Sequence, residues 1–222
     1  MSQRGAAAVE RAVSAFERGE PVCVHDAADR EGETDLVVPA SAVTPDLVAT
    51  LRNDAGGLVC VALADPVADA FELPFAADAV DHPASGGPVH YDERSSFSLS
   101  VNHVDTYTGI TDRDRARTIT ELGAAAEAAL DGGYGVEAFA ESFRAPGHVH
   151  LLRAAPTLDD RQGHTELAVA LAEAAGREPA AVVCEMLDDV TGEALTPADA
   201  RAYAERRGLA YVEGASLIDA FA

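Results

Sequence analysis

The sequence predicts one α+β domain spanning residues 1–222, and three observations support this prediction. Segments with the apolar spacing of amphipathic helices are mixed with short apolar or alternating segments that are typical of strands. The two kinds of segment do not follow the regular strand–helix repeat of a doubly wound fold. Hydrophobic residues make up 48% of the chain, enough for a substantial core, and no repeat, low-complexity tract or linker divides it.

The first half of the chain contains two helix signals and two strand signals. Residues 6–18 place apolar side chains on one helical face and are followed by Gly19, a common residue after a helix. Thr44 and Pro45 have the N-cap and N1 preferences of a helix that reaches about residue 55. Apolar runs predict strands at 21–25 and 58–63, and the Pro-, Asp- and Gly-rich stretch 64–95 predicts irregular structure with a mobile loop at 83–95.

The second half predicts further elements of both kinds. Residues 97–101 alternate apolar and polar side chains, as in a half-buried strand. Asp112 or Asp114 begins a long Ala-rich helix that ends near Gly132. The remaining predicted helices are 165–175, 197–207 and a short one ending at 221, and the remaining strands are 148–152, 181–186 and 209–212.

The charge of the chain is extreme. It carries 38 Asp and Glu residues against 16 basic ones, for a net charge of −22, and every basic residue is Arg. Such a surface repels nucleic acid and anionic membranes, so we expect neither as a partner. We interpret the acidity as that of a halophile, because molar salt shortens the Debye length to about 3 Å and screens the repulsion. An ordinary acidic mesophilic protein is the alternative, although the absence of Lys argues against it.

The chain is expected to be a soluble, cytoplasmic protein. No apolar run approaches the roughly 18 residues of a membrane span, and the N-terminus lacks the apolar stretch of a signal peptide. Cys23, Cys60 and Cys184 are odd in number, far apart and each within an apolar run. This pattern fits reduced core thiols, and neither a disulfide framework nor a CxxC zinc site is predicted.

An acidic cluster at residues 26–35 lies between two strand-like segments. In an extended segment, Glu31, Glu33 and Asp35 point to one side and Arg30 to the other. Carboxylates this close repel one another unless they share a cation, and three oxygen donors on one face suit Mg²⁺. A solvated acidic turn is the alternative interpretation. The carboxylates of the cluster are Asp26, Asp29, Glu31, Glu33 and Asp35.

Residues 161–166 form a second candidate site just before a predicted helix. Gly163 allows close approach of the backbone, and the helix N-terminus offers unpaired N–H groups to an anion. Arg161 and the Thr165 hydroxyl add hydrogen-bond donors, and His164 adds a nitrogen that can bind a metal. Simple capping of the helix would explain the same residues.

Two further residues have the chemistry of acid–base catalysts. His148 follows Pro146-Gly147 at the start of an apolar strand, and Glu185 lies within another apolar strand, where a carboxylate is costly unless it is paired or liganded. We interpret both as proton-transfer groups. A core histidine and a glutamate at a solvent-facing strand edge are the alternatives.

Taken together, these motifs resemble a known family. Five segments occur in the order of the 3,4-dihydroxy-2-butanone 4-phosphate (DHBP) synthase signature, and the likeness spans about residues 10–220. The segments are 29–35 (DREGETD), 108–110 (TGI), 146–149 (PGHV), 161–166 (RQGHTE) and 184–185 (CE).

The resemblance implies both a fold and a reaction. The fold is a three-layer α/β/α arrangement with a mixed sheet. The activity is that of a lyase of riboflavin biosynthesis, which converts D-ribulose 5-phosphate to L-3,4-dihydroxy-2-butanone 4-phosphate and formate. The family uses Mg²⁺ (or Mn²⁺), and the resemblance implies two ions per active site. It also implies a homodimer with active sites near the subunit interface.

The resemblance also assigns roles to residues of this chain. Glu31 and His164 would bind the metals, with Glu33 as a possible extra ligand, and His148 and Glu185 would be the catalytic acid–base pair. Cys60 falls where the family tends to have a cysteine near the site. The residues implied to bind the substrate are Arg30, Glu31, Asp35, Arg161, Gln162, Gly163, His164, Thr165 and Glu185.

The chain departs from many bacterial members of the family. It has Gly32 between the two glutamates where they have Asn, and Ala145 before Pro-Gly-His where they have Arg, with Arg144 one position further back. Both features resemble archaeal members and leave the role of Arg144 open. Because no cysteine cluster of a fused GTP cyclohydrolase II domain is present, we expect the archaeal, monofunctional type.

Two other functional classes compete with this prediction. A non-catalytic homologue that binds nucleotides or RNA would use a related fold, but the chain has no basic stripe and retains the full acid–base and metal set. A pentose-phosphate isomerase or aldolase would also use enediolates. A Schiff-base aldolase needs a lysine, which the chain lacks, and release of formate distinguishes the synthase from an isomerase.

Overall fold

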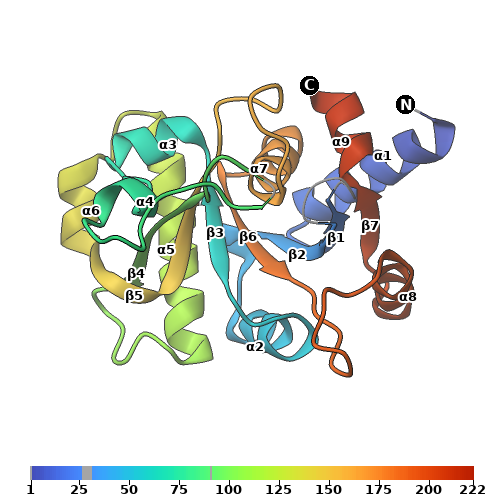
Figure 1. Cartoon of the computed structure of the whole chain (residues 1–222), viewed down its shortest axis with the longest axis horizontal. Helices are drawn as coiled ribbons and strands as arrows, with labels where there is room; N and C mark the ends of the chain where they lie inside the picture. The colour runs from blue at the N-terminus through green and yellow to red at the C-terminus, as the bar shows by residue number, and fades with distance from the viewer. Residues whose placement is uncertain (1, 27–31, 91) are drawn as a thin grey trace.

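A mixed β-sheet between two layers of helices forms the centre of the molecule (Figure 1). The computed structural model describes residues 2–26, 32–90 and 92–222. Within them the sheet has seven strands in the order β4-β5-β3-β6-β2-β1-β7, of which β1/β7 and β3/β5 pair parallel and the rest antiparallel. The predicted α+β, three-layer fold with a mixed sheet is therefore confirmed. The strands are β1 (Val22–His25), β2 (Thr34–Pro39), β3 (Cys60–Leu63), β4 (Phe97–His103), β5 (Phe143–Arg153), β6 (Ala180–Glu185) and β7 (Ala210–Glu213).

The helices cover both faces of the sheet. Figure 1 shows α1, α7 and α9 on one face and α2, α5 and α8 on the other, with α3, α4 and α6 around the β4–β5 end. No helix in the described part of the chain is long and apolar enough to cross a membrane. The helices are α1 (Gln3–Glu17), α2 (Pro45–Asp54), α3 (Asp65–Ala70), α4 (Ala76–Ala79), α5 (Asp112–Leu130), α6 (Val136–Ser142), α7 (His164–Ala174), α8 (Pro197–Arg207) and α9 (Gly214–Phe221), with a 3-10 turn η1 at Ala40–Ala42.

The core lies on both sides of the central strands. Every residue of β2 is buried, as are the first five residues of β6, so residues 36–39 and 180–184 form apolar runs rather than alternating patterns. Leu167 and Leu171 of α7 and Leu51 of α2 are fully buried on opposite faces. Each such side chain contributes roughly 1.5–3 kcal/mol on burial. The rigid centre of the sheet is therefore also the support for the strand ends that carry Asp35 and Glu185.

Short-range capping sets the ends of several helices, as the sequence predicts for Thr44. The side chains of Thr44, Thr111 and Thr196 each accept a hydrogen bond from the backbone N–H three residues on. Such caps contribute about 1 kcal/mol each. Gly208 ends α8 in the left-handed region, with φ of 69°.

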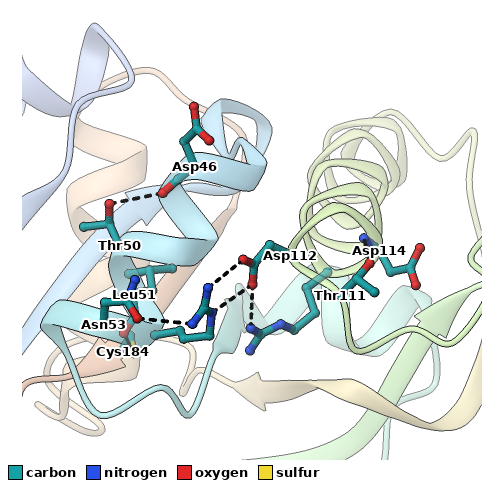
Figure 2. Close-up of polar contacts among 10 residues, drawn as sticks. Asp46, Thr50, Leu51, Asn53, Thr111, Asp112, Asp114 and Cys184 are labelled. Carbon is teal, nitrogen blue, oxygen red and sulfur yellow. Dashed lines mark hydrogen bonds and ion pairs between the residues drawn. The ribbon is translucent and has the colours of Figure 1, made fainter.

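Helix α2 is held between α5 and the sheet (Figure 2). The Asp112 carboxylate at the start of α5 accepts hydrogen bonds from Arg52 Nε and Nη2 of α2, at 3.2 and 3.1 Å, and from Arg115 Nη2 at 3.1 Å. On the other side of α2, the Cys184 thiol of β6 donates to the carbonyl oxygen of Leu51 over 3.7 Å. These contacts fix α2 beneath the strand that carries Glu185.

The structure differs from the sequence prediction in three short helices and one long strand. Stretch 64–95 contains α3 and α4, and α6 precedes β5. The sequence did not predict these helices, because helices of four to seven residues are too short to show a period and depend on tertiary packing. Strand β5 begins at Phe143, five residues earlier than predicted. The Pro146-Gly147 pair indicates a turn, but Gly147 lies against β4, where a Cβ would come within 2.0 Å of the Val101 carbonyl carbon.

Candidate active site

Four of the residues singled out in the sequence line one small cavity at the N-terminus of α7. They are Cys60, Arg161, His164 and Glu185, and the other lining residues are Leu58, Ser95, Ser96, Phe97, Leu152 and Val183. The cavity measures about 40 Å³. A neighbouring cavity of about 790 Å³ shares Ser95, Ser96 and Arg161 with it. The two together offer space for a small phosphorylated sugar, for which the small cavity alone is insufficient.

The sheet brings Glu185 and Asp35 face to face. The two residues are direct partners in the antiparallel pairing of β2 with β6, and Asp35 is fully buried. Directly opposed side chains have Cβ atoms about 5 Å apart, and two like charges at this distance destabilise a sheet unless a cation or proton is shared. The pairing thus places two carboxylates, which are oxygen ligands for a cation, at neighbouring positions of the sheet.

Cys60 lies on the same face of the sheet as Glu185. It pairs with Val183 of β6, two residues before Glu185, and with His150 of β5 on its other side. Burial, followed by the nearby Glu185 carboxylate, raises the pKa of the Cys60 thiol, so the thiol is protonated at neutral pH. Cys60 is thus a neutral part of the cavity wall and is unsuited to act as a nucleophile.

The turn before α7 is organised by Glu166, which sequence reasoning missed. Its carboxylate accepts hydrogen bonds from the backbone N–H groups of Gly163 (3.1 Å) and Ala155 (2.9 Å) and from Arg161 Nη1 (2.6 Å). A Cβ at Gly163 would lie 2.7 Å from Arg161 Nη1, so glycine is needed for this close packing. A glutamate three residues after a helix N-cap was the available sequence signal, because such a residue commonly turns back to the cap.

Arg161 is held between two carboxylates. In addition to Glu166, its Nε donates to Asp92 Oδ2 at 2.6 Å. Burial opposes the charge of the guanidinium, but the Glu166 and Asp92 carboxylates more than offset this, so the pKa of Arg161 lies above its ordinary value. Asp92 comes from the segment between α4 and β4, which the sequence did not connect with Arg161.

The first turn of α7 presents the remaining residues of the RQGHTE motif. His164 and Thr165 are the first two residues of the helix, Thr165 is fully buried, and Gln162 is half-buried. The N-terminus of an eleven-residue helix offers N–H groups and a positive dipole end to an anion. The predicted phosphate-binding turn and the predicted metal-binding histidine therefore lie side by side.

His148 lies apart from the cavity. It is two residues before His150 in β5, which places it on the same line across the sheet as Glu185, two strands or about 10 Å away. Its side chain is exposed, and Asn102 Oδ1 lies 3.2 Å from its Nδ1 and 2.9 Å from its backbone nitrogen. The structure thus does not bring His148 and Glu185 together within one chain.

Asn102, which contacts His148, also lies against Gly109 of the TGI motif. A Cβ at Gly109, whose φ is 81°, would lie 2.1 Å from Asn102 Nδ2. Asp114 fixes the motif, because its carboxylate accepts hydrogen bonds from the backbone N–H groups of Thr108 and Gly109 at 3.2 and 2.9 Å. Arg144, whose role the sequence left open, donates from Nη1 to the carbonyl oxygens of Ala140 and Phe143.

The predicted metal ligands lie only partly within the described residues. Arg30 and Glu31 fall outside them. In residues 2–26, 32–90 and 92–222, no three His, Cys, Asp or Glu side chains are grouped closely enough to form a metal site on their own. The carboxylates of Asp35 and Glu185 are nonetheless oxygen donors that suit a hard divalent cation, and the imidazole of His164 is a common metal ligand. The described donors therefore fit a divalent cation.

Comparisons with known proteins agree on one family. The DHBP synthase family model, described as 3,4-dihydroxy-2-butanone 4-phosphate synthase, matches residues 10–220. Enzymes of that name from Methanosarcina mazei and Archaeoglobus fulgidus are 48% and 47% identical to this chain. The matches cover 96% of this chain and 90% of the former protein, and 95% of this chain and 92% of the latter.

Solved structures of the same enzyme resemble this fold. The Candida albicans synthase superimposes with a TM-score of 0.78 at 29% identity, covering 96% of this chain and 97% of that one. A synthase in complex with two magnesium ions gives a TM-score of 0.76 at 32% identity, covering 96% and 95%. The chain therefore belongs to the 3,4-dihydroxy-2-butanone 4-phosphate synthase family, lyases of riboflavin biosynthesis.

Proposed function

We propose that this chain converts D-ribulose 5-phosphate to L-3,4-dihydroxy-2-butanone 4-phosphate and formate, as a single catalytic domain spanning residues 1–222. The observation that carries the proposal is the convergence of Glu185, His164 and Arg161 on one cavity from two separate parts of the chain, the end of β6 and the turn that begins α7. A carboxylate, a metal-binding imidazole and a phosphate-binding guanidinium are the groups that this reaction needs. The likeness to the archaeal enzymes supports the same assignment.

The substrate phosphate would bind at the start of α7. Arg161 offers paired donors, the helix offers N–H groups, Gly163 allows close approach, and the Thr165 hydroxyl adds a donor. Gln162 flanks the same turn. Arg30 and Asp35 would hold the sugar hydroxyls, and Asp35 is suited to this because it faces Glu185 across the sheet.

Glu31 and His164 would bind the metal, with Mg²⁺ or Mn²⁺ as the ion and two ions per site. A synthase structure that resembles this chain is in complex with two magnesium ions, which supports this number. When bound, the ions would polarise the carbonyl and hydroxyl oxygens of the sugar and stabilise enediolate charge. The close carboxylates of Asp35 and Glu185 add negative charge that favours cation binding nearby.

Glu185 and His148 would move protons between carbon and oxygen atoms of the substrate. Glu185 reaches the cavity from the end of β6 and is suited to take a proton from the sugar. Asn102 Oδ1 lies near Nδ1 of His148; when Nδ1 carries the proton, Nε2 is left as the base. The reaction balances without a further reactant, since a five-carbon ketose phosphate yields a four-carbon phosphate and formate.

The position of His148 favours a homodimeric enzyme. A single chain leaves it exposed and about two strands from Glu185. In a homodimer, His148 of one protomer would complete the site of its partner. This arrangement explains why an exposed histidine follows a Pro-Gly pair that packs tightly against β4.

Formate detection during incubation with ribulose 5-phosphate tests the proposal. We expect one formate per sugar consumed when Mg²⁺ or Mn²⁺ is present and none after exhaustive chelation. Release of a five-carbon isomer without formate would instead indicate an isomerase. Full activity in the chelated enzyme would show that the reaction does not require the metal.

A further inference from the structure

The arginine assigned to the substrate phosphate is already engaged by two carboxylates. Arg161 Nε donates a hydrogen bond to Asp92 and Nη1 donates one to Glu166, each with a donor–acceptor distance of 2.6 Å. The three side chains are 15%, 17% and 2% exposed, so water screens these contacts only weakly. One positive charge with two negative partners leaves a net negative environment. A phosphate dianion that approaches Arg161 is therefore repelled unless one carboxylate moves away.

Glu166 cannot move without breaking the turn. Its carboxylate also accepts the N–H groups of Gly163 and Ala155, and it lies in the buried first turn of α7. Withdrawing it would leave these backbone donors without their acceptor, at a cost typical of lost buried hydrogen bonds. Glu166 is therefore a fixed part of the site.

Asp92 is the partner that can be exchanged. It lies between α4 and β4, in a segment whose described residues form no helix or ladder, only an isolated bridge between Val89 and Asp92. Two of its hydrogen bonds are local: its N–H donates to the Val89 carbonyl oxygen, and its Oδ1 accepts the N–H of Glu93. The ion pair with Arg161 spans 69 positions in the sequence. Releasing Asp92 from Arg161 breaks this distant contact and keeps the two local hydrogen bonds.

We propose that Asp92 is an internal competitor for the phosphate of the substrate. Its carboxylate occupies Arg161 in the ligand-free protein and is displaced when the phosphate binds. Arg161 lines both the small cavity and the larger one, and Asp92 lines the larger one, so the exchange takes place where the two cavities meet. A monoanion would replace one negative charge by another, whereas a phosphate dianion brings two, so the exchange favours phosphorylated ligands. This inference rests on the proposed role of Arg161.

Binding of inorganic phosphate to the intact enzyme tests the exchange. Its affinity would be measured by calorimetry and as competitive inhibition, at low and constant ionic strength. We expect Asp92→Asn to bind phosphate at least about threefold more tightly than wild type, since one partly buried ion pair no longer competes. Asp92→Glu keeps the charge and should keep the wild-type affinity.

Asp160→Asn is the matched control. Asp160 lines the same cavity and adjoins Arg161 in the chain, but its carboxylate accepts the Thr157 hydroxyl and not Arg161. The substitution removes an equal charge and should tighten phosphate binding less than Asp92→Asn does. Equal gains in phosphate affinity in the two variants would show that Asp92 acts only through its general negative charge, and would overturn the inference. Weaker binding in Asp92→Asn would also overturn it, because Asp92 would then orient Arg161 for the ligand.

Arg161→Gln separates this inference from the proposed function. If it leaves phosphate binding unchanged, the assignment of Arg161 fails and the inference fails with it. If Arg161→Gln loses phosphate binding while Asp92→Asn gains none, the inference alone fails. We expect Arg161→Gln to lose binding in both the wild-type and the Asp92→Asn background.

Discussion

At the scale of single residues, Glu185 and His148 carry the proposed proton transfers from different positions. Glu185 lines the cavity, whereas His148 is exposed on β5 beside Asn102. Positioned acid–base groups contribute about 10²–10⁴-fold to turnover. We therefore expect Glu185→Gln and His148→Ala each to lower turnover by at least about 100-fold while the far-UV circular dichroism and melting temperature are retained.

Surface variants provide the controls for these two substitutions. Glu193→Gln and His82→Ala change the same residue types at exposed positions outside the cavity, and both should keep wild-type turnover. Near-wild-type turnover in Glu185→Gln or His148→Ala would make that residue structural.

The buried thiols predict a loss of stability at alkaline pH. Burial raises the pKa of Cys23 and of Cys184 to about 12. A raised pKa in the folded state favours the protonated form, so the stabilisation is complete below the unfolded pKa of about 8.5 and is lost as pH rises toward the folded value. Between these values each thiol lowers the free energy of unfolding by about 1.4 kcal/mol per pH unit.

Urea unfolding from pH 8 to pH 11 checks this prediction. Cys184→Ala removes a thiol that packs against α2, outside the cavity. We expect the variant to be less stable than wild type, and its free energy of unfolding to fall less steeply with pH. A slope identical to wild type would show that Cys184 does not contribute.

The sequence predicted which residues lie together where those residues are close in the chain. The RQGHTE turn was found because its glycine, histidine and helix start are adjacent. Asp92 and Asn102 were missed, because their partners Arg161 and His148 lie 69 and 46 positions away and only the tertiary fold brings them together. Glu166 left a capping signal, but its contact with Ala155 depends on tertiary structure.

At the scale of elements, the α2–α5 contact predicts a response to acid. The hydrogen bond from Arg52, and then that from Arg115, lowers the pKa of Asp112, although burial opposes the shift (Figure 2). A lowered pKa gives stability that is present above the unfolded pKa of about 3.9 and is lost as pH falls through the folded value. We expect Asp112→Asn to destabilise the protein at pH 7 by at most about 1 kcal/mol, because Arg52 is half-exposed.

Melting curves of Asp112→Asn and Arg52→Gln, singly and together, measure the contact. Loss of the pair should make the double variant little less stable than either single variant. Asp46→Asn, on the same helix, is the control for charge. Additive losses in the double variant would show that the two side chains act independently.

The elements were predicted in proportion to the strength of their local signals. Helix α8 was predicted at 197–207, as observed, because Pro197 and Gly208 mark its two ends. Helices α3, α4 and α6 were missed, since they are held by packing around β4 and β5 rather than by a period of their own. The pairing order of the strands could not be read from the chain, because it depends on contacts between distant segments.

At the scale of the whole molecule, the charge predicts a dependence on salt. With a net charge of −22, the many acidic side chains repel one another. Salt screens this repulsion, because the Debye length falls from about 30 Å at 0.01 M to about 3 Å at 1 M salt. We propose a halophilic adaptation and expect melting temperature and activity to rise from dilute buffer to molar KCl. Mg²⁺ and substrate should partly replace salt, because they bind only the folded site.

A KCl series of thermal melts, with and without both ligands, tests the salt prediction. Light scattering across the same series would report whether the proposed homodimer also strengthens as repulsion is screened. A melting temperature that stays constant or falls with salt would show that the acidity is not a halophilic adaptation.

The most direct test follows the carbon atoms of the substrate. Uniformly ¹³C-labelled ribulose 5-phosphate would be incubated in an NMR tube with wild type, with Glu185→Gln and with chelated wild-type enzyme. We expect formate and a four-carbon phosphate in equal amounts from the wild type with Mg²⁺, and neither from the other two samples. Formate at the wild-type rate in Glu185→Gln or in the chelated enzyme, or a five-carbon product throughout, would contradict a metal-assisted carbon loss at this site.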